Sequence, residues 1–273
     1  MNNVLDQITP LILTFNEEAN LSRTLAGLGW ARRIVVIDSG STDATLEVLA
    51  AHSNVEVVHR PFDTHGCQWN AGLALISQGW VLSLDADYVV TPSLQQALVA
   101  AINQAESSGS PASSEGCTNG FQIPFRYCVA GRPLRGTVLP PRIALFRCGC
   151  GEYIDDGHTQ DLMLRGRVGL IPEPILHDDR KPLDRWLWAQ QRYMRRETDK
   201  LLHTPDTQLS RADRLRKRTW LAPLAVLLVC LVQKRACLDG WRGWFYAFQR
   251  SYAELLLLLM LMDARRISRP ASA

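Results

Sequence analysis

The sequence predicts an α/β fold in which a mostly parallel sheet is covered by helices. Between Ile8 and about Ala105, short runs of strand-favouring residues alternate with helical stretches. The run from Trp80 to Asp85 is almost entirely apolar, which is typical of a strand buried on both faces. This run is followed closely by a second carboxylate, Asp87, so two acids are expected at the edge where open α/β sheets bind ligands.

The remaining elements follow in order along the chain. We expect strands at 8–14, 33–38, 55–60 and 80–85, and helices at 17–28, 42–52, 66–78 and 92–105. Residues 107–116 are small and polar, which indicates a surface loop. Further strands are expected at 121–128, 142–147 and 162–171, where they would cover one end of the sheet.

Beyond Pro182 the pattern becomes helical. Leu187, Met194 and Leu201 recur at heptad spacing, and residues 180–218 hold 12 Lys or Arg against 5 Asp or Glu. The apolar runs at 220–232 and 255–262 are shorter than the ~20 residues that cross a bilayer. Together with several Trp residues they predict helices lying on a membrane surface, and a buried helical hairpin packed on protein is the alternative.

The length and composition fit a folded protein with one large domain, or with one domain and an appendage. The 273 residues are 47% hydrophobic and 21% charged, with a formal net charge of +3. The seven cysteines are odd in number and form no Cys-x-x-Cys pair, so reduced thiols in the cytoplasm are expected. The first residues do not resemble a secretory signal. Nucleic-acid binding is disfavoured because the positive charge lies beside apolar, Trp-rich segments.

Polar side chains follow the first two predicted strands. Thr14 ends the first strand, and Asp38 ends the second, where no helix cap is needed. In a parallel sheet both would meet Asp85 at one edge, where an acid accepts from a base N–H or a ribose hydroxyl. The turn that begins at Ser39 also starts a helix, so its N–H groups are suited to a phosphate. Asp43 has an equally good explanation as a helix-capping residue.

Four motifs in order resemble family-2 glycosyltransferases over about the first hundred residues. The motifs occupy residues 13–18, 36–43, 68–72 and 84–87, and their order is more specific than any single motif. The resemblance implies a GT-A-type nucleotide-diphospho-sugar transferase fold, an α/β/α sandwich, and a reaction that inverts the anomeric centre. It assigns the donor to residues 1–105 and the acceptor to residues 121–181. Residues 1–181 would then form the transferase domain, and residues 182–273 a membrane-associated helical region.

The resemblance also implies roles for individual residues. It places a nucleoside pocket at Thr14, Asn16 and Glu17, base recognition at Asp38, and contacts to the base or diphosphate at Trp69 and Asn70. For Trp69, helix packing is an equal alternative. Asp85 would contact the ribose or sugar, and Asp87 would bind Mg²⁺ or Mn²⁺, which often use one or two carboxylates together with phosphates.

The general base is less clearly indicated. Related lipopolysaccharide-core enzymes often carry His-Glu where this chain has Thr159-Gln160, and neither of these residues is a useful base. Asp156 is the first candidate and Asp161 the second, with His158 orienting a group or binding the acceptor. Each of the three also fits an ordinary turn.

A second acid-rich segment follows the last predicted strand. His177 stands among two acids and two cations, where it would help to hold the metal or the diphosphate. The alternative is a solvated charged loop.

These observations predict an inverting, metal-dependent glycosyltransferase. Its donor would be a nucleotide-diphospho-sugar, and its acceptor a lipopolysaccharide-core or other lipid-linked glycan at the cytoplasmic face of the membrane. One alternative is a polyprenyl-phosphate sugar synthase. Another is a membrane scaffold that binds nucleotide-sugar without turnover. This alternative is favoured because position 160 holds Gln where the related enzymes have Glu. A homo-oligomer is left open.

Overall fold

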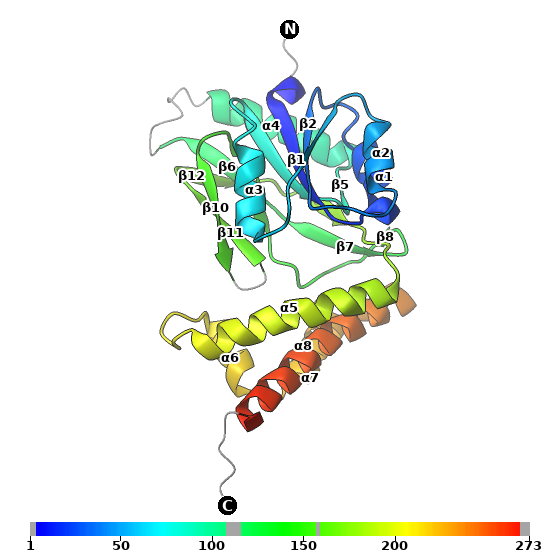
Figure 1. Cartoon of the computed structure of the whole chain (residues 1–273), viewed down its shortest axis with the longest axis vertical. Helices are drawn as coiled ribbons and strands as arrows, with labels where there is room; N and C mark the ends of the chain where they lie inside the picture. Colours follow the sequence, from blue (N-terminus) through cyan, green and yellow to red (C-terminus); the bar gives the residue numbers. More distant parts are fainter. Residues whose placement is uncertain (1–3, 108–115, 157–158, 268–273) are drawn as a thin grey trace, which may run out of the picture. The chain divides into compact units, whose positions relative to one another are not determined.

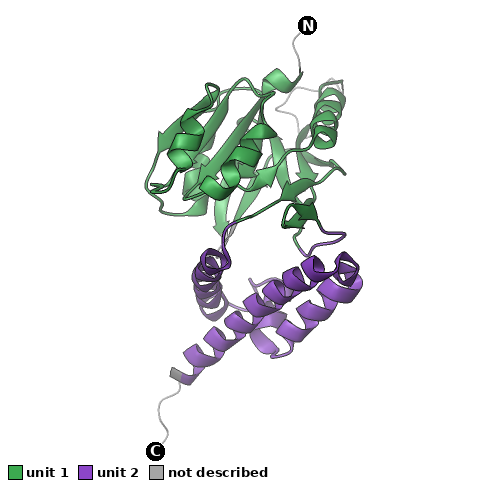
Figure 2. Cartoon of the chain, turned by 90° about the vertical axis from the view of Figure 1, so that its right-hand side faces the viewer, with its two compact units in different colours: residues 1–133, 139–155, 160–180 green, residues 134–138, 156–159, 181–273 purple. Residues whose placement is uncertain are grey.

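The structure is a computed structural model that describes residues 4–107, 116–156 and 159–267. The chain divides into two compact units, coloured separately in Figure 2. Unit 1 comprises residues 1–133, 139–155 and 160–180, and unit 2 comprises residues 134–138, 156–159 and 181–273.

Unit 1 is built on a seven-stranded sheet (Figure 1). In spatial order its strands are β12 (Arg167–Leu170), β6 (Thr118–Ile123), β9 (Arg142–Arg147), β4 (Trp80–Asp85), β1 (Ile8–Thr14), β2 (Ile34–Asp38) and β3 (Val55–His59). β4, β1, β2 and β3 are mutually parallel, and β6 pairs in parallel with β12. β9 is antiparallel to both β4 and β6. The predicted α/β fold with a mostly parallel central sheet is therefore confirmed.

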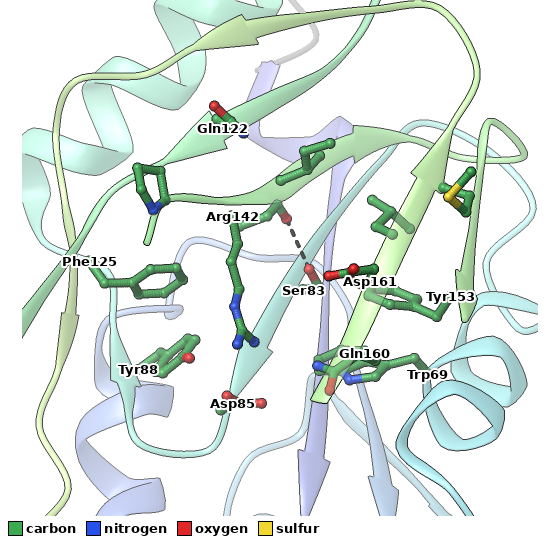
Figure 3. A pocket seen from close by; sticks show the side chains of 15 residues that line it. Trp69, Ser83, Asp85, Tyr88, Gln122, Phe125, Arg142, Tyr153, Gln160 and Asp161 are labelled. Carbon is green, nitrogen blue, oxygen red and sulfur yellow. Dashed lines mark hydrogen bonds between the residues drawn. The ribbon is translucent and has the colours of Figure 1, made fainter. Parts of the chain in front are cut away.

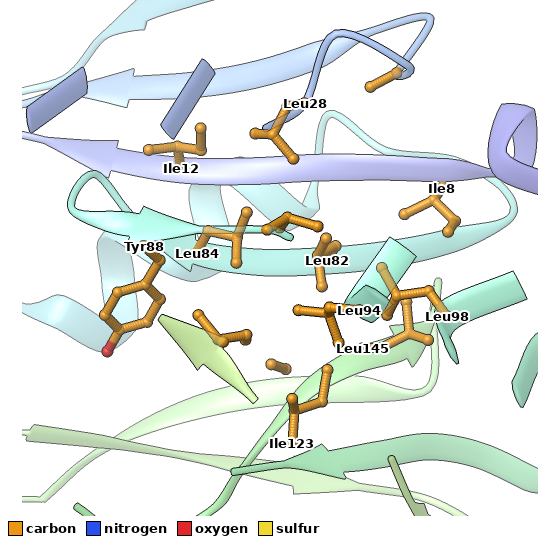
Figure 4. Packing of buried hydrophobic residues seen from close by; sticks show 14 of the residues in the cluster. Ile8, Ile12, Leu28, Leu82, Leu84, Tyr88, Leu94, Leu98, Ile123 and Leu145 are labelled. Atoms are coloured by element: carbon orange, nitrogen blue, oxygen red, sulfur yellow. The ribbon is translucent and has the colours of Figure 1, made fainter. Parts of the chain in front are cut away.

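Two hydrophobic clusters hold helices against the two faces of the sheet. On one face, α1 (Glu18–Ala26), α2 (Thr45–Ala50) and α4 (Pro92–Ser107) pack on side chains such as Ile12 and Leu82 (Figure 4). On the other face, α3 (His65–Leu73) contributes Trp69 to a cluster with Leu11 and Val81. Because β2 and β4 are buried along almost their whole length, they need apolar residues at consecutive positions.

Two smaller sheets extend unit 1. One orders β5 (Tyr88–Val89), β13 (Ile175–His177), β7 (Phe125–Val129) and β8 (Arg132–Pro133), and the other is the pair β10 (Gly151–Asp156) and β11 (Thr159–Leu164). The single strand predicted at 162–171 is wrong, because β11 and β12 are separate strands in different sheets. Gly166 turns the chain between them with φ +101°, a backbone conformation that glycine adopts without strain.

Another glycine sets the start of β4. Gly79 has φ +80°, and a Cβ at this position would collide with the backbone carbonyl of Gln7. A side chain here would therefore displace the strand that leads to Asp85.

Unit 2 contains four α-helices among its described residues: α5 (Leu183–His203), α6 (Arg211–Arg218), α7 (Ala222–Leu228) and α8 (Trp241–Ile267). A π-helical turn (Val229–Gln233) and a 3-10 turn (Ala236–Asp239) connect α7 to α8, and the 3-10 turn Val4–Gln7 precedes β1 in unit 1. Met194 and Leu201 of the heptad pattern pack on Leu257 and Leu261 of α8. Arg216 joins the helices by pairing with buried Glu197 at 2.9 Å and with Glu254 at 3.0 Å.

Candidate active site

The strand ends bring three of the predicted site residues to one edge of the sheet. Thr14 is the register partner of Asp38, and Leu13 is the register partner of Asp85. This alignment follows from the parallel pairing, since the carboxyl ends of parallel strands lie at the same edge.

Asp38 organises the loop that follows β2. Its side chain is 0% exposed, and its Oδ2 accepts from the backbone N–H groups of Gly40 at 2.9 Å and Ser41 at 3.0 Å. Its Oδ1 accepts from the hydroxyls of Thr14 at 3.1 Å and Ser41 at 2.5 Å. Burial raises the pKa of Asp38, but these hydrogen bonds outweigh burial and lower it below the ordinary value of 3.8. Asp38 therefore fixes the loop as an ionised carboxylate.

This arrangement predicts a pH-dependent contribution to stability. Because the pKa of Asp38 is lower in the folded than in the unfolded chain, its charge stabilises the fold above the unfolded value. That stabilisation is lost as the pH falls through the lower folded value. We expect Asp38→Asn to cost about 1–3 kcal/mol of unfolding free energy at pH 7 and clearly less at pH 3, measured by urea denaturation. A difference that stays constant between the two pH values would contradict this account.

The loop after β1 is held in an unusual conformation. Asn16 has φ +55°, a left-handed region that asparagine tolerates better than most residues. Its N–H donates to Ser41 Oγ at 2.9 Å, and its Oδ1 accepts from Thr42 N at 2.8 Å. Glu17 N donates to Thr45 Oγ1 at 2.7 Å. The loops after β1 and β2 thus form one hydrogen-bonded unit.

Asp87 and His177 lie together although they are far apart in the sequence. β13 pairs antiparallel with β5 so that His177 stands opposite Tyr88, and His177 Nε2 lies 3.0 Å from Asp87 Oδ2. Burial lowers the pKa of His177, but the charge of Asp87 and its hydrogen bond outweigh burial and raise it. Nδ1 of His177 is buried without a hydrogen-bond partner among the described residues.

The Asp87 and His177 pair suits a divalent cation. An Asp oxygen and an imidazole nitrogen are both suitable ligands, and Mg²⁺ or Mn²⁺ sites are commonly completed by substrate phosphates. Within residues 4–107, 116–156 and 159–267, no three His, Cys, Asp or Glu side chains are grouped as a self-sufficient metal site. A cation held here would take its further ligands from the substrate or from water.

Asn20 connects this pair to the loop after β1. Its buried side chain donates from Nδ2 to Glu17 Oε2 at 2.9 Å and to Asp179 Oδ1 at 3.0 Å. Next to His177, Asp178 N donates to the carbonyl of Asp87 at 2.9 Å. These contacts position the segment after β13 against Glu17, which follows β1, and Asp87, which follows β4.

A cavity of about 310 Å³ opens beside Asp85. Figure 3 shows the side chains that line it, most of them contributed by α3, β4, β5, β6, β7, β9, β10 and β11. Its polar lining includes Ser83, Asp85, Gln122, Arg142, Gln160 and Asp161, and its aromatic lining consists of Trp69, Tyr88, Phe125 and Tyr153. Such a mixture of aromatic walls and a few polar groups is typical of small-molecule sites.

Tyr88 links the cavity to the Asp87 and His177 pair. Burial raises the pKa of Tyr88 well above its ordinary value, and the charges of Asp85 and Asp87 raise it further. Its hydroxyl therefore stays protonated and can donate a hydrogen bond in the cavity that it lines together with Asp85. The Tyr88 ring also contacts the ring of His177, with centroids 5.2 Å apart.

Trp69 and Asn70 attach α3 to the β10–β11 hairpin. The Trp69 ring stacks on Tyr153 with a centroid distance of 5.2 Å, and Asn70 exchanges two hydrogen bonds of 2.8 and 2.9 Å with the Tyr153 backbone. At the start of α3, Gly66 N donates to Asp155 Oδ1 at 2.8 Å. In this structure the Asn70 amide hydrogen bonds to the β10–β11 hairpin. Its predicted contact with the donor stays a prediction.

The paired hydrogen bonds of Asn70 predict a stability effect. Asn70→Ala leaves two backbone groups of Tyr153 without their partner, so we expect it to lower the free energy of unfolding by about 1–3 kcal/mol. Asn103→Ala, on the exposed side of α4, should stay within about 0.5 kcal/mol of the wild type. Urea denaturation measures both. Equal stability of the two variants would show that Asn70 does not anchor the hairpin.

The structure describes the side chain of only one of the candidate bases. Asp161 lines the cavity together with Asp85, and so does Gln160. Asp156 ends β10, but its side chain lies outside the described part of the structure, as does the whole of His158. Ser39 lies in the loop after β2, where its Oγ accepts from Gln68 Nε2 at 2.9 Å.

The sequence gives no sign that several of these residues belong to the site. Tyr88, Arg142 and Tyr153 carry no motif, and their places depend on pairings between distant strands. Asn20 lies in a helix that sequence predicts, but its partner Asp179 is 159 residues away. A helical pattern alone gives no sign of that contact.

Comparison with known proteins identifies similar chains. The family model described as glycosyl transferase family 2 matches residues 11–143. The lipopolysaccharide core biosynthesis glycosyltransferase LpsC of Rhizobium meliloti is 28% identical over 95 residues, which cover 33% of this chain and 35% of LpsC. The uncharacterized glycosyltransferase Mb0553 of Mycobacterium bovis is 34% identical over 82 residues, 30% of this chain and 37% of that protein. The matched segments thus span about a third of each of these relatives.

Solved structures with a similar arrangement also exist. S. aureus TarS 1–349 in complex with UDP-GlcNAc is 13% identical with a TM-score of 0.48, covering 97% of this chain and 93% of that one. Glucosyl-3-phosphoglycerate synthase from Mycobacterium tuberculosis is 19% identical with a TM-score of 0.44, covering 69% and 79% respectively.

Proposed function

We propose that this chain is a member of glycosyl transferase family 2, whose model matches residues 11–143, and that it transfers a sugar from a nucleotide-sugar donor to a lipid-linked or lipopolysaccharide-core acceptor. One observation carries this proposal: Thr14, Asp38 and Asp85 end adjacent parallel strands, and the cavity opens beside the last of them. A nucleotide over the first two strands would place its sugar at Asp85 and the acceptor in the cavity. The reaction would invert the anomeric centre.

The donor half consists of the two joined loops and the Asp87 and His177 pair. The loops after β1 and β2 offer backbone groups and the Glu17 carboxylate to a nucleoside, while Asp38 keeps them in place. Asp87 and His177 would hold Mg²⁺ or Mn²⁺. When bound, the cation would neutralise charge on the departing nucleoside diphosphate. The hydrogen bonds of Asn20 to Glu17 and Asp179 would hold these two parts of the donor half together.

The acceptor half is the cavity. Inversion requires a base on the face of the sugar opposite the leaving group, within hydrogen-bond reach of the attacking hydroxyl. Asp161 supplies that carboxylate, because it shares the cavity with Asp85. Aromatic side chains of the walls would lie against the apolar faces of a sugar ring.

A screen of nucleotide-sugars tests the proposal. We expect one class of nucleotide-sugar to bind in the presence of Mn²⁺ and to support transfer of labelled sugar to a glycolipid extract. Transfer to a phosphate-ended polyprenol instead of a glycolipid hydroxyl would replace the proposal with a polyprenyl-phosphate sugar synthase. Tight binding without turnover on either acceptor would identify a binding protein.

We further propose that unit 2 attaches the enzyme to the cytoplasmic face of a membrane. α8 buries one stripe of side chains, which includes Tyr246, Ala253, Leu257 and Leu261. It exposes a second apolar stripe that consists of Trp241, Trp244, Phe248, Tyr252, Leu255, Leu259 and Met262. Their spacing of three or four residues places them on one side of the helix.

The surroundings of the exposed stripe favour lipid as its partner. In the segment around α7, Trp220, Leu224, Leu228 and Val232 are also exposed. Trp and Tyr rings suit the headgroup level, and the exposed Arg218, Arg265 and Arg266 suit anionic headgroups. No described helix is both long and apolar enough to span a bilayer. The helices would therefore lie along the surface.

Vesicle flotation tests this attachment. We expect the protein to float with vesicles of phosphatidylcholine and phosphatidylglycerol, and the double variant Leu255→Ser, Leu259→Ser to bind roughly tenfold more weakly or worse. Leu170→Ser, an exposed position on β12 of unit 1, is the matched control and should bind normally. Unchanged binding of the double variant would contradict the proposal, as would a wild-type dimer that the double variant dissociates.

A further inference from the structure

Because β9 runs antiparallel to β4, the first residue of β9, Arg142, lies near the edge of the sheet where β4 ends. Leu145 is the register partner of Leu82, and Arg142 at the start of β9 lines the same cavity as Asp85 at the end of β4. In Figure 3 the Arg142 side chain extends into the cavity toward Asp85, between Tyr88 and Gln160. The positively charged guanidinium of Arg142 therefore lies in the cavity, where the proposed function would bring the donor and acceptor sugars together.

Arg142 differs from the arginine at the other end of the same strand. Arg147 is paired with Glu106 at 3.0 Å and lies over the Trp80 ring. Among the described residues, no ion pair within 4.0 Å involves Arg142. A guanidinium stays charged and presents five N–H donors in a rigid fork, so it cannot act as an acid or base here. Its fork matches the two oxygens of a carboxylate or phosphate.

The other charged groups of the cavity restrict where an anion can lie. Asp85 and Asp161 also line it, and both repel a negative group. The position next to Arg142 is therefore the favourable one, which would fix the orientation of a charged sugar. At about 310 Å³ the cavity is at the small end of ligand sites, which suits a single sugar unit.

We propose that the cavity binds a sugar bearing a carboxylate or phosphate group, and that Arg142 pairs with this group. The inference rests on the proposed function and names the class of its acceptor. The donor diphosphate would be held by the cation at Asp87 and His177, and neither of these residues lines the cavity. We therefore assign the acidic group to the acceptor sugar, which the proposed function places in the cavity.

Binding of three small probes tests the proposal. Methyl glucuronide and glucose 6-phosphate carry the two anionic groups, and methyl glucoside is their neutral counterpart. By NMR titration we expect the wild type to bind at least one charged probe about tenfold or more tightly than the neutral one. Arg142→Met should abolish this preference, and Arg142→Lys should retain part of it, because the charge remains but the fork is lost. Arg167→Met, exposed on β12 and outside the cavity lining, should keep the full preference.

Two results would overturn the proposal. One is equal binding of charged and neutral probes by the wild type. The other is a loss of nucleoside diphosphate binding in Arg142→Met with the preference among sugars intact, which would assign Arg142 to the donor. Circular dichroism confirms that each variant is folded, and Arg142→Lys provides the comparison if Arg142→Met is not. Sugar transfer by a wild type that shows no preference for charged probes would refute this inference alone, whereas absence of any transfer would refute the proposed function.

Discussion

Replacing Asp161 with asparagine should lower kcat by roughly 10²- to 10⁴-fold, the usual contribution of a positioned general base. Asparagine has nearly the same shape but cannot accept the proton of the attacking hydroxyl. Asp161 is the candidate base that the structure places in the cavity with Asp85. Because the proposed function places Asp161 on the acceptor side, we expect the dissociation constant of the donor to change by less than about threefold. Initial rates of labelled-sugar transfer at saturating substrate measure kcat, and titration measures donor binding.

Two variants make this result specific. Glu152→Gln lies on the same hairpin, is exposed and does not line the cavity, so it should retain full activity. Asp156→Asn tests the other candidate. Full activity of Asp161→Asn together with inactive Asp156→Asn would transfer the role of base to Asp156.

Replacing Asp87 with asparagine should lower metal-dependent transfer by roughly 10³-fold, which corresponds to the several kcal/mol that a metal contributes to such a reaction. The substitution removes the negative charge that lies 3.0 Å from His177 and would hold a divalent cation. Nucleoside diphosphate binding should then require a much higher concentration of Mn²⁺. Titration of that binding with Mn²⁺ measures the change independently of turnover.

The control for this variant is a surface carboxylate. Glu56→Gln removes a charge that pairs with Arg33 at the surface, so its dependence on Mn²⁺ should equal that of the wild type. If Asp87→Asn and the wild type require the same concentration of Mn²⁺, the cation is held elsewhere.

Local sequence patterns were sufficient for the donor half of the fold. The run from Trp80 to Asp85 forms β4 with the expected bounds, because a strand buried on both faces needs consecutive apolar residues. Parallel pairing then brings Thr14, Asp38 and Asp85 to one edge. Both features depend on neighbouring residues and on a topology with few alternatives.

The acceptor half depends on pairings that a strand pattern does not encode. The sequence predicts a strand at 142–147, but it gives neither the partner nor the direction of β9. The direction decides that Arg142 rather than Arg147 lies in the cavity with Asp85. Similarly, His177 meets Asp87 only because β13 pairs with β5. The split between β11 and β12 was missed because residues 162–171 favour strand on both sides of Gly166.

The central claim is that this chain moves a sugar from a nucleotide to an acceptor. The most direct test is to incubate the purified full chain with the nucleotide-sugar it binds, labelled in the sugar, and a glycolipid extract, with Mn²⁺ or with EDTA. Our account predicts equal amounts of nucleoside diphosphate and labelled glycolipid, formed with Mn²⁺ and suppressed by EDTA. Tight binding of the donor with neither product formed would contradict it.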